Sequence, residues 1–425
     1  MLESMRIVGG KPLIGTIKIS GSKNMALPAL AAGLLTEEPI TLTNVPELAD
    51  IKSMMELLSY IGADISQIDK NTVSICTKNV KFLEAPYDFV RKMRASILVL
   101  GALIGRFGSA SVSLPGGCAI GTRGVDLHIK ALEELGATIS LENGYIHAQA
   151  PRDGLIGTDI NFPIVTITGV ENVMMAACYA KGTTRLINSP IEPEVVAFAD
   201  LLNKMGADIT GHGTHIITIN GVEKLHGTEF LIIPDRIEAG TYAVAAAATH
   251  GEIFLENCNY DHLSGFFSLL QKTGTCCKKK DNGVLVGKAK SQETIIHSLE
   301  VETAPYPGLA TDLQAQLMVL ITRCNGVSSI TENIFENRFM HVPELVRMGA
   351  DISIHGKTAI LKGVPKLGGA HVMATDLRAS VSLVIAGLIA EGETVVNRLY
   401  HLNRGYEDID EKLRKCGAIL ERFCV

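Results

Sequence analysis

One stretch of the chain combines residue types that could carry out chemistry. Between Ser113 and His128 the sequence reads SLPGGCAIGTRGVDLH, which places Cys118 and Arg123 on a loop with four glycines. Glycine lets a backbone take positive φ and approach a ligand closely. A thiol beside an arginine and near a helix start has surroundings that lower a thiol pKa. The stretch therefore predicts a reactive cysteine. The alternative is a strand-to-helix turn whose inert thiol fills a small gap.

The segments on either side of this loop indicate how it is held. Residues 110–114 alternate in the manner of a strand, and Pro115 ends that run. Residues 127–135 have the apolar spacing of an amphipathic helix. A strand is thus expected to enter the loop and a helix to leave it.

A short phrase that returns six times organises the rest of the chain. In each copy of the phrase, helix-forming residues precede a glycine and β-like residues follow it. The glycines of successive copies lie 68 to 75 residues apart. Each phrase predicts a helix that ends at glycine and runs directly into a strand. The six glycines are Gly62, Gly136, Gly206, Gly274, Gly349 and Gly417.

Upstream of most phrases lies a β-like segment opened by glycine, as at Gly182, Gly251, Gly326 and Gly392. An alanine-rich helix precedes each such segment, for example at 174–179, 241–249 and 380–390. These helices are apolar on nearly every side, so they should be buried. The expected unit is strand, helix, strand, helix, strand, with sheets outside and helices inside.

Six such units predict an α/β protein of two domains, each formed by three repeats of about 70 residues. Residues 22–234 would form the first domain, which carries the Cys118 loop. Residues 235–425 would form the second, joined by residues 1–21, because a strand at 11–20 precedes the first helix near Met25.

Composition excludes several classes of function. The 425 residues are 47% hydrophobic with a mean hydropathy of +0.24, yet no apolar run is long enough to span a membrane. The first residues lack the layout of a signal peptide. Nine cysteines form no CxxC pair, which favours a reducing, cytoplasmic setting. A net charge of −6 argues against nucleic acid as a partner, and no phosphate loop or GxGxxG is present.

Nine motifs, in this order along the chain, carry a resemblance to a known family. They are Lys18–Asn24, Met93–Ser96, Leu114–Cys118, Arg123–His128, Pro234–Glu238, Thr311–Gln316, Phe335–His341, Thr375–Ser380 and Tyr400–Tyr406. Together they resemble the UDP-N-acetylglucosamine 1-carboxyvinyltransferases of the enolpyruvyl transferase family. The resemblance covers the chain from Met5 to about Phe423. It implies two inside-out α/β barrels, an N-terminal strand that packs with the C-terminal half, and an active site in the cleft between the domains.

The resemblance also implies a reaction. The family transfers the enolpyruvyl group of phosphoenolpyruvate to the 3′-hydroxyl of UDP-N-acetylglucosamine and releases phosphate. A tetrahedral ketal forms by addition and decays by elimination, in the first committed step of peptidoglycan precursor synthesis. Such chemistry needs a carbon acid, a hydroxyl base and cations that bind the anionic substrate. No cofactor and no metal are implied, and neither nucleic acid nor a membrane is an expected partner. A covalent adduct on Cys118 and inhibition by fosfomycin are expected.

Site residues follow from the same motifs. Cys118 is implied to protonate the enol methylene, and Asp312 to take the hydroxyl proton. The residues implied in catalysis are Cys118, Asp312, Lys23, Arg404 and Asp376. Those implied to bind phosphoenolpyruvate are Lys23, Asn24, Arg123, Arg338, Arg378 and Arg404. Those implied to bind UDP-N-acetylglucosamine are Arg94, Arg123, Gly124, Val125, Asp126, Leu127, Val165, Thr166, Ile167, Asp312 and Ile334.

Three positions depart from the family pattern. Gly124 stands where many members have proline, Ile164 where some have lysine, and Ala310 where proline is usual. The expected consequences are a looser uridine loop and one diphosphate contact fewer. None of the three is a residue needed for bond making.

Each candidate also has a purely structural alternative. Arg338 and Arg404 could be surface ion-pair partners, and Asp312 and Asp376 could cap the helices that follow them. Two histidines, His212 and His215, have the setting of a hairpin tip.

Two rival functions remain at this point. One is a 5-enolpyruvylshikimate-3-phosphate synthase-type transferase, and the other is a non-catalytic repeat scaffold. For an enzyme whose cations come from both halves of the chain, closure of the domains on the nucleotide sugar is expected.

Overall fold

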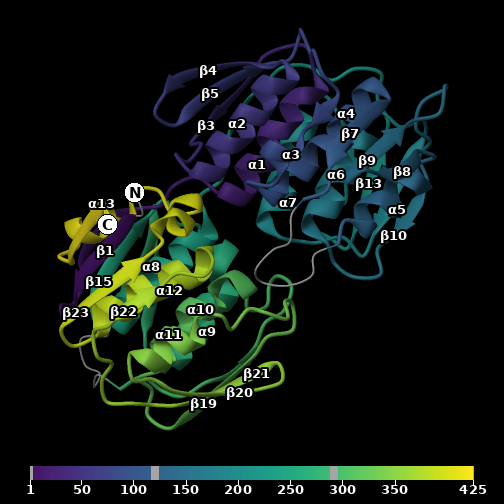
Figure 1. The fold of residues 1–425 in the computed structure, drawn as a ribbon. Coiled ribbons are helices and arrows are strands. Elements are labelled where there is room, and N and C mark those ends of the chain that lie inside the picture. Colours follow the sequence, from purple (N-terminus) through teal and green to yellow (C-terminus); the bar gives the residue numbers. More distant parts are fainter. Residues whose placement is uncertain (1–2, 116–123, 288–294, 425) are drawn as a thin grey trace. The chain divides into compact units, whose positions relative to one another are not determined.

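The structure is a computed structural model that describes residues 3–115, 124–287 and 295–424, and these form two compact units (Figure 1). The N-terminal unit holds residues 21–115 and 124–233, and the C-terminal unit holds the remaining described residues. The described chain changes unit after Ser20 and after Ile233. Hydrogen bonds from Ser22 N to Ile233 O (2.7 Å) and from Asp235 N to Ser20 O (2.8 Å) hold these two passages side by side.

The N-terminal unit has three four-stranded sheets among its described residues, in the strand orders β14-β3-β5-β4, β6-β7-β9-β8 and β10-β11-β13-β12. Its strands are β3 (Ile40–Thr43), β4 (Asp64–Asp69), β5 (Thr72–Cys76), β6 (Glu84–Ala85), β7 (Ser109–Ser113), β8 (Thr138–Glu142), β9 (Tyr145–Gln149), β10 (Asp159–Asn161), β11 (Thr183–Ile187), β12 (Asp208–Thr210), β13 (Ile216–Asn220) and β14 (Glu229–Leu231). Its helices are α1 (Lys23–Ala32), η1 (Gly33–Leu35), α2 (Ala49–Ile61), α3 (Tyr87–Val90), η2 (Arg94–Leu98), α4 (Val99–Phe107), α5 (Asp126–Glu134), α6 (Ile167–Ala177) and α7 (Pro193–Lys204).

The C-terminal unit repeats this plan with the sheets β22-β23-β1-β24, β16-β17-β15-β2 and β18-β19-β21-β20. Its strands are β1 (Glu3–Val8), β2 (Ile14–Lys18), β15 (Glu252–Glu256), β16 (Cys276–Lys280), β17 (Gly283–Gly287), β18 (Glu300–Glu302), β19 (Val327–Thr331), β20 (Asp351–His355), β21 (Thr358–Lys362), β22 (His371–Met373), β23 (Glu393–Asn397) and β24 (Ile419–Cys424). Its helices are α8 (Arg236–Ala248), η3 (Tyr260–Leu263), α9 (Ser264–Lys272), α10 (Thr311–Ile321), α11 (Val342–Arg347), α12 (Leu377–Ile389), η4 (Leu399–Arg404) and α13 (Ile409–Lys415).

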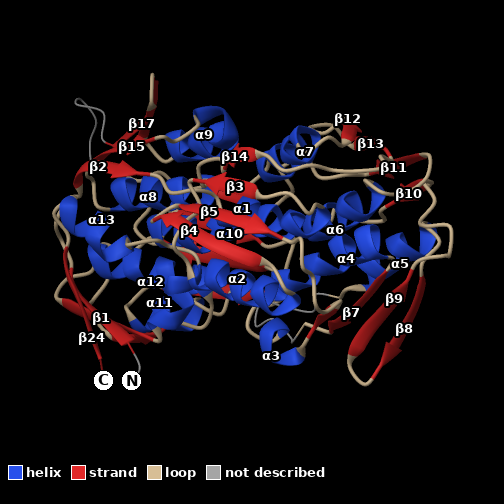
Figure 2. Ribbon diagram, turned by 90° about the horizontal axis from the view of Figure 1, so that it is seen from above, coloured by secondary structure: helices blue, strands red, loops and turns tan. Residues whose placement is uncertain are grey.

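Three helices form the centre of each unit, as the alanine-rich patterns predict. They are α1, α4 and α6 in one unit and α8, α10 and α12 in the other, and nearly all their residues are buried. In α8 every residue from Ile237 to Ala248 is buried. Figure 2 shows the helices in blue and the strands in red. Alanine suits this position because a helix without bulky side chains can lie close to its neighbours. The inside-out α/β architecture is confirmed.

The repeated phrase behaves as predicted in all six places. Each of its glycines has a positive φ, between 93° and 118°. Glycine takes this conformation without the steric cost that other residues incur, so the helix ends there and the chain turns outward. A strand begins two residues after each glycine, from β4 at Asp64 to β24 at Ile419.

The predicted repeat lacks one strand. A tight hairpin follows the second helix of most repeats, such as β8–β9, whose strands are joined at residues 143–144. Two strands joined by so short a turn look like one β-like stretch in the sequence. The sixth repeat obtains its fourth strand from the start of the chain. Strand β1, which was not predicted, pairs antiparallel with both β23 and β24 and brings Glu3 opposite Cys424 (Figure 1).

Candidate active site

In the N-terminal unit, Lys23 and Asn24 begin helix α1. The Ser22 hydroxyl caps this helix by accepting a hydrogen bond from Met25 N (3.4 Å). Lys23 Nζ lies 2.6 Å from Asp50 Oδ2, and the two side chains are only 11% and 5% exposed. A buried ion pair of this kind holds the ammonium in one place, because either charge alone would be costly to bury. Asp50 lies outside the nine motifs, so sequence reasoning missed it.

Arg94 is joined to the segment that follows the cysteine loop. Its Nη2 donates to Gly124 O at 2.9 Å. Gly124 to Leu127 lead into helix α5, and Asp126 is its first residue. A side chain on residue 124 would meet Asp126 Oδ1 at 2.4 Å, so glycine there leaves room for this carboxylate. The expected nucleotide-sugar segment that starts at Gly124 is therefore joined directly to Arg94.

The second expected nucleotide segment, Val165 to Ile167, begins helix α6, with Thr166 at its N-cap position. Asn172 on the same helix donates to Ile97 O (3.0 Å) and to Nδ1 of His128 (2.9 Å), so it joins η2, α5 and α6. Burial, helped by the Arg94 charge, lowers the pKa of His128 to about 4. Asn172 was also missed, although a polar residue inside an apolar helical run is the signal that would have found it.

Acid is expected to destabilise the protein through His128. Its pKa is 6.5 when exposed and about 4 when folded, so between these pH values the unfolded chain binds more protons. Stability should therefore fall as pH drops from about 6.5 towards about 4, by on the order of 3 kcal/mol from this group. Urea unfolding at a series of pH values measures the slope. The His128→Gln variant should show a smaller slope. The same substitution at His147, which is exposed on β9, should leave the slope as it was. Equal slopes for all three proteins would contradict the assignment.

In the C-terminal unit, Asp312 lies between two arginines. Arg338 Nη2 donates to its Oδ1, and Arg378 Nη2 donates to its Oδ2 at 3.0 Å. Both arginine side chains are buried, at 4% and 7% exposure, whereas Asp312 is 29% exposed. The chain separations are 26 and 66 residues, so only folding brings the three groups together.

A network of hydrogen bonds holds the Arg378 guanidinium in place. Its Nη1 donates to Tyr406 Oη at 3.1 Å, and Tyr406 Oη lies 2.9 Å from Thr241 Oγ1. Gln316 Nε2 donates to Thr241 Oγ1 (3.0 Å) and to Asp312 O (2.9 Å). Burial alone would lower the Arg378 pKa, but the Asp312 charge outweighs it and the pKa is raised. The Arg378 guanidinium is thus charged, and its hydrogen bonds fix its orientation.

The sequence left helix capping as the alternative role of Asp312 and Asp376, and only Asp376 is a cap. Asp376 does cap helix α12, since its Oδ1 accepts from Arg378 N (2.8 Å) and Ala379 N (3.0 Å). Asp312 does not cap helix α10, because that helix starts at Thr311 and its N-cap residue is Ala310. The capping alternative for Asp312 is therefore wrong.

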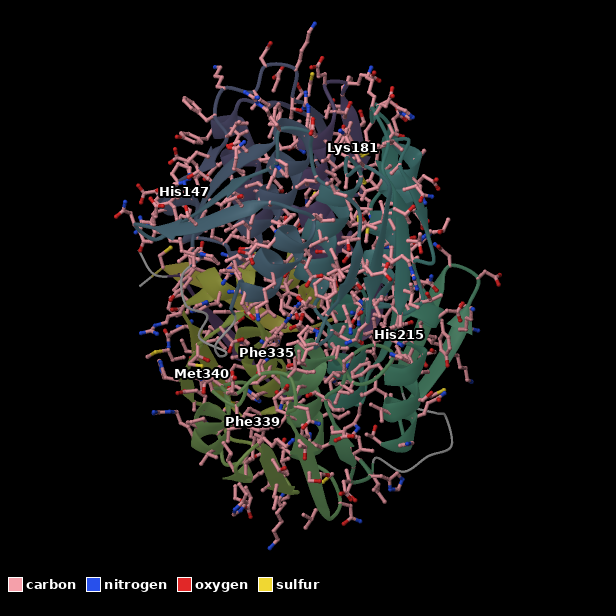
Figure 3. The ribbon with its side chains drawn as sticks, turned by 90° about the vertical axis from the view of Figure 1, so that its right-hand side faces the viewer. His147, Lys181, His215, Phe335, Phe339 and Met340 are labelled. Carbon is pink, nitrogen blue, oxygen red and sulfur yellow. The ribbon has the colours of Figure 1, made fainter. Side chains whose placement is uncertain are left out.

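The surface alternative for Arg338 is also wrong, because its side chain is buried. Figure 3 labels Phe335, Phe339 and Met340, which precede and follow Arg338 in the chain. Arg404 ends η4 and is half-buried. The two histidines at 212 and 215 lie in the turn between β12 and β13, as the hairpin interpretation predicts.

Glu332, whose buried carboxylate belongs to none of the nine motifs, stabilises the loop before Arg338. It accepts hydrogen bonds from Thr303 Oγ1 (2.8 Å), Thr311 Oγ1 (3.0 Å) and Ile334 N (2.8 Å). It therefore connects the start of helix α10, next to Asp312, to the expected nucleotide contact Ile334, which is 37% exposed.

Cys118 and Arg123 lie outside the described residues. Three of the other cysteines are poor candidates for reactivity. Burial raises the pKa of Cys178, Cys258 and Cys277 to about 12 in each case. Such thiols carry almost no thiolate at neutral pH, and the thiolate is the reactive form.

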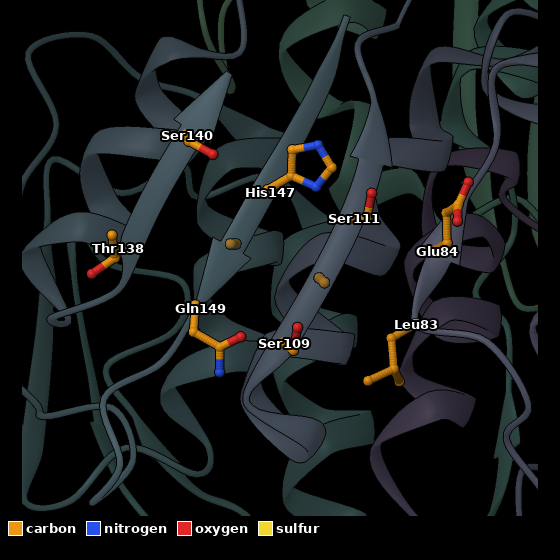
Figure 4. A pocket seen from close by; sticks show the side chains of 10 residues that line it. Leu83, Glu84, Ser109, Ser111, Thr138, Ser140, His147 and Gln149 are labelled. Atoms are coloured by element: carbon orange, nitrogen blue, oxygen red, sulfur yellow. The ribbon is translucent and has the colours of Figure 1, made fainter. Parts of the chain in front are cut away.

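A hollow of about 510 Å³ lies on the sheet β6-β7-β9-β8 (Figure 4). Its wall consists of Leu83, Glu84, Ser109, Ala110, Ser111, Thr138, Ser140, His147, Ala148 and Gln149. None of these is an expected site residue, and none is a lysine or arginine. The hollow therefore lacks the cations that an anionic substrate needs. Within the described ranges, no group of three or more His, Cys, Asp and Glu residues is arranged to hold a metal ion. No helix there has the length and hydropathy needed to cross a membrane.

Comparisons with known proteins find matches over nearly the whole chain. Residues 7–413 match the family model described as EPSP synthase (3-phosphoshikimate 1-carboxyvinyltransferase). A UDP-N-acetylglucosamine 1-carboxyvinyltransferase of Acidiphilium cryptum (strain JF-5) is 53% identical over 422 residues, 99% of this chain and 100% of the relative. Another from Rhodospirillum centenum (strain ATCC 51521 / SW) is 52% identical and covers 99% of both chains.

Two solved structures are similar in fold. The enolpyruvyl transferase NikO from Streptomyces tendae superposes with a TM-score of 0.89 at 25% identity, over 99% of both chains. EPSP synthase from Acinetobacter baumannii gives a TM-score of 0.78 at 17% identity, over 99% of this chain and 100% of that one.

Proposed function

The chain belongs to the enolpyruvyl transferase family, and on this premise we propose how its residues carry out the reaction. The protein transfers the enolpyruvyl group of phosphoenolpyruvate to UDP-N-acetylglucosamine, which is the committed step of peptidoglycan precursor synthesis. The reaction has two demands. The donor anion must be held by cations, and a proton must reach the enol carbon while another leaves the sugar 3′-hydroxyl.

The donor anion is proposed to be bound by several side-chain cations. Lys23, kept in place by Asp50, is proposed to bind the phosphate together with Asn24, Arg123 and Arg404. Buried Arg338 and Arg378 present fixed guanidinium groups, which suit bidentate capture of a carboxylate or phosphate. Side-chain cations neutralise the donor, so the proposal includes no metal and no cofactor.

Proton transfer is assigned to one thiol and one carboxylate. Cys118 donates its proton to the enol methylene, and the sugar 3′-oxygen attacks C2 to form a tetrahedral ketal. Asp312 receives the hydroxyl proton. Elimination then breaks the bond from C2 to phosphate and returns a proton from the methyl carbon to the Cys118 thiolate, which restores the double bond, with Asp376 near the reacting carbon. The observation that carries the proposal is the pair of buried guanidinium groups, Arg338 and Arg378, on either side of Asp312, because they offer fixed positive charge to the donor anion beside this carboxylate.

The nucleotide sugar is assigned to the N-terminal unit. Arg94 and the segment from Gly124 to Leu127 are joined by a hydrogen bond, and the segment from Val165 to Ile167 opens helix α6 beside them. The shared residue Asn172 packs η2, α5 and α6 together through Ile97 and His128. Ile334 and Asp312 are proposed as further contacts of the nucleotide sugar.

A direct assay tests this function. Purified protein is supplied with phosphoenolpyruvate and either UDP-N-acetylglucosamine or shikimate 3-phosphate, and phosphate release is measured. We expect phosphate to be released when UDP-N-acetylglucosamine is the acceptor and not when shikimate 3-phosphate is. Release only with shikimate 3-phosphate would identify the sister activity. Calorimetry that detects neither substrate would favour a non-catalytic scaffold instead.

Further consequences of this function remain proposals. The enzyme would act in the cytoplasm and would support cell wall biogenesis, cell shape and division. Cys118 would form a covalent adduct with phosphoenolpyruvate and would be the target of fosfomycin.

A further inference from the structure

The carboxylate assigned as the base is fully engaged by cations. Each Asp312 oxygen accepts from a different guanidinium, one from Arg338 and one from Arg378. A carboxylate paired with two cations is held in its charged form, because opposite charges nearby favour ionisation. In this arrangement Asp312 would be a poor acceptor for a hydroxyl proton.

The same two arginines are the groups expected to bind the donor. Arg338 and Arg378 are buried, and a buried guanidinium left without an anion is strongly destabilising. An anion must therefore stay beside them. Either the Asp312 carboxylate or an incoming carboxylate or phosphate can satisfy this requirement.

We propose that Asp312 is an internal counter-ion that phosphoenolpyruvate displaces. The donor anion takes over Arg338 and Arg378, and the freed Asp312 carboxylate becomes able to accept the proton of the sugar hydroxyl. The O–H bond breaks as the sugar oxygen bonds to C2 of the donor, and its proton moves to Asp312. Asp312 thus becomes able to accept a proton only when phosphoenolpyruvate is bound. This inference rests on the function proposed above and adds a trigger to it.

The surroundings indicate which partner moves. Arg378 is held by the phenol of Tyr406, which is itself bound to Thr241, and the Arg338 guanidinium carbon lies 5.7 Å from the centre of the Phe335 ring. Both arginines are nearly inaccessible, whereas Asp312 is 29% exposed and sits in the first turn of α10. Rotation of the Asp312 side chain leaves the two cations where they are.

Phosphoenolpyruvate affinity tests this exchange. The parent protein carries Cys118→Ser, which blocks the adduct and turnover, and calorimetry is run with saturating UDP-N-acetylglucosamine. Adding Asp312→Asn removes the competing charge at constant shape. Phosphoenolpyruvate should then bind roughly tenfold or more tightly, since a charge-assisted contact no longer has to be broken. Inorganic phosphate, titrated as a second probe, should change in the same direction.

Control variants separate the exchange from a general charge effect. Asp410→Asn removes a carboxylate that pairs with Arg414 and Arg422, neither of which is an expected donor ligand, and should have no effect. Asp312→Glu keeps the charge and should bind like the parent.

The outcomes are distinct. Unchanged or weaker binding by the Asp312→Asn protein would overturn the exchange and leave the proposed function intact. Equal tightening by Asp410→Asn would overturn it as well. Failure of the parent to bind phosphoenolpyruvate at all would overturn the proposed function, and the exchange with it. A smaller variant, Asp312→Ala, should repeat the tightening and guards against misfolding of the first.

Discussion

Replacing Cys118 by alanine or serine is expected to remove nearly all turnover, whereas replacement by aspartate is expected to keep much of it. The proposed role of Cys118 is to protonate carbon, so the position needs an acid of the right reach. Aspartic acid meets this need, while serine has the shape of cysteine but is too weak an acid at neutral pH. Steady-state phosphate release from the four proteins measures the difference.

The same variants separate acid catalysis from obligatory covalent catalysis. If the thiol must form an adduct, the aspartate protein should be inactive, because it cannot form a thioether bond. If only an acid is needed, that protein should be active and resistant to fosfomycin. Mass mapping after brief alkylation should find Cys118 modified first, and Cys178, Cys258 and Cys277 unmodified, since burial raises their pKa values to about 12. Normal turnover by the serine protein would contradict the role.

Removing Lys23 is expected to harm both folding and catalysis, in ways that a second substitution can separate. In Lys23→Ala the buried Asp50 carboxylate loses its cation, which costs about 3–5 kcal/mol of stability. Loss of a charge-assisted contact to the donor should also lower kcat/KM by roughly tenfold to over a hundredfold. Urea unfolding and steady-state kinetics measure the two effects independently.

The double variant Lys23→Ala, Asp50→Ala distinguishes the two roles. Removing both charges takes away this ion pair as a whole, so most of the lost stability should return, while kcat/KM should remain low. An exposed ion pair, Lys224 with Glu38, is the control, and its disruption should change neither quantity appreciably. Recovery of full activity by the double variant would show that Lys23 is only structural.

The sequence by itself determined the repeat and its polarity. Six glycines at a spacing of 68 to 75 residues predicted six helix ends, and all six have positive φ in the structure. Alanine-rich apolar runs predicted buried helices, and helices such as α8 are enclosed. These features are readable because they depend on backbone conformation and on hydrophobic period, which are properties of neighbouring residues. The resemblance carried by nine motifs supplied the candidate site residues, Cys118 and Arg123 among them.

Only the tertiary structure decided which charges meet. The pairing of Lys23 with Asp50, and of Asp312 with both Arg338 and Arg378, joins residues 26 to 66 positions apart. The pairing of β1 with β23 and β24 joins the two ends of the chain. No local pattern encodes such contacts, since each charged residue alone suits a helix cap or a solvated surface. Their partners are chosen when the helices pack, because a buried charge must be placed against an opposite one.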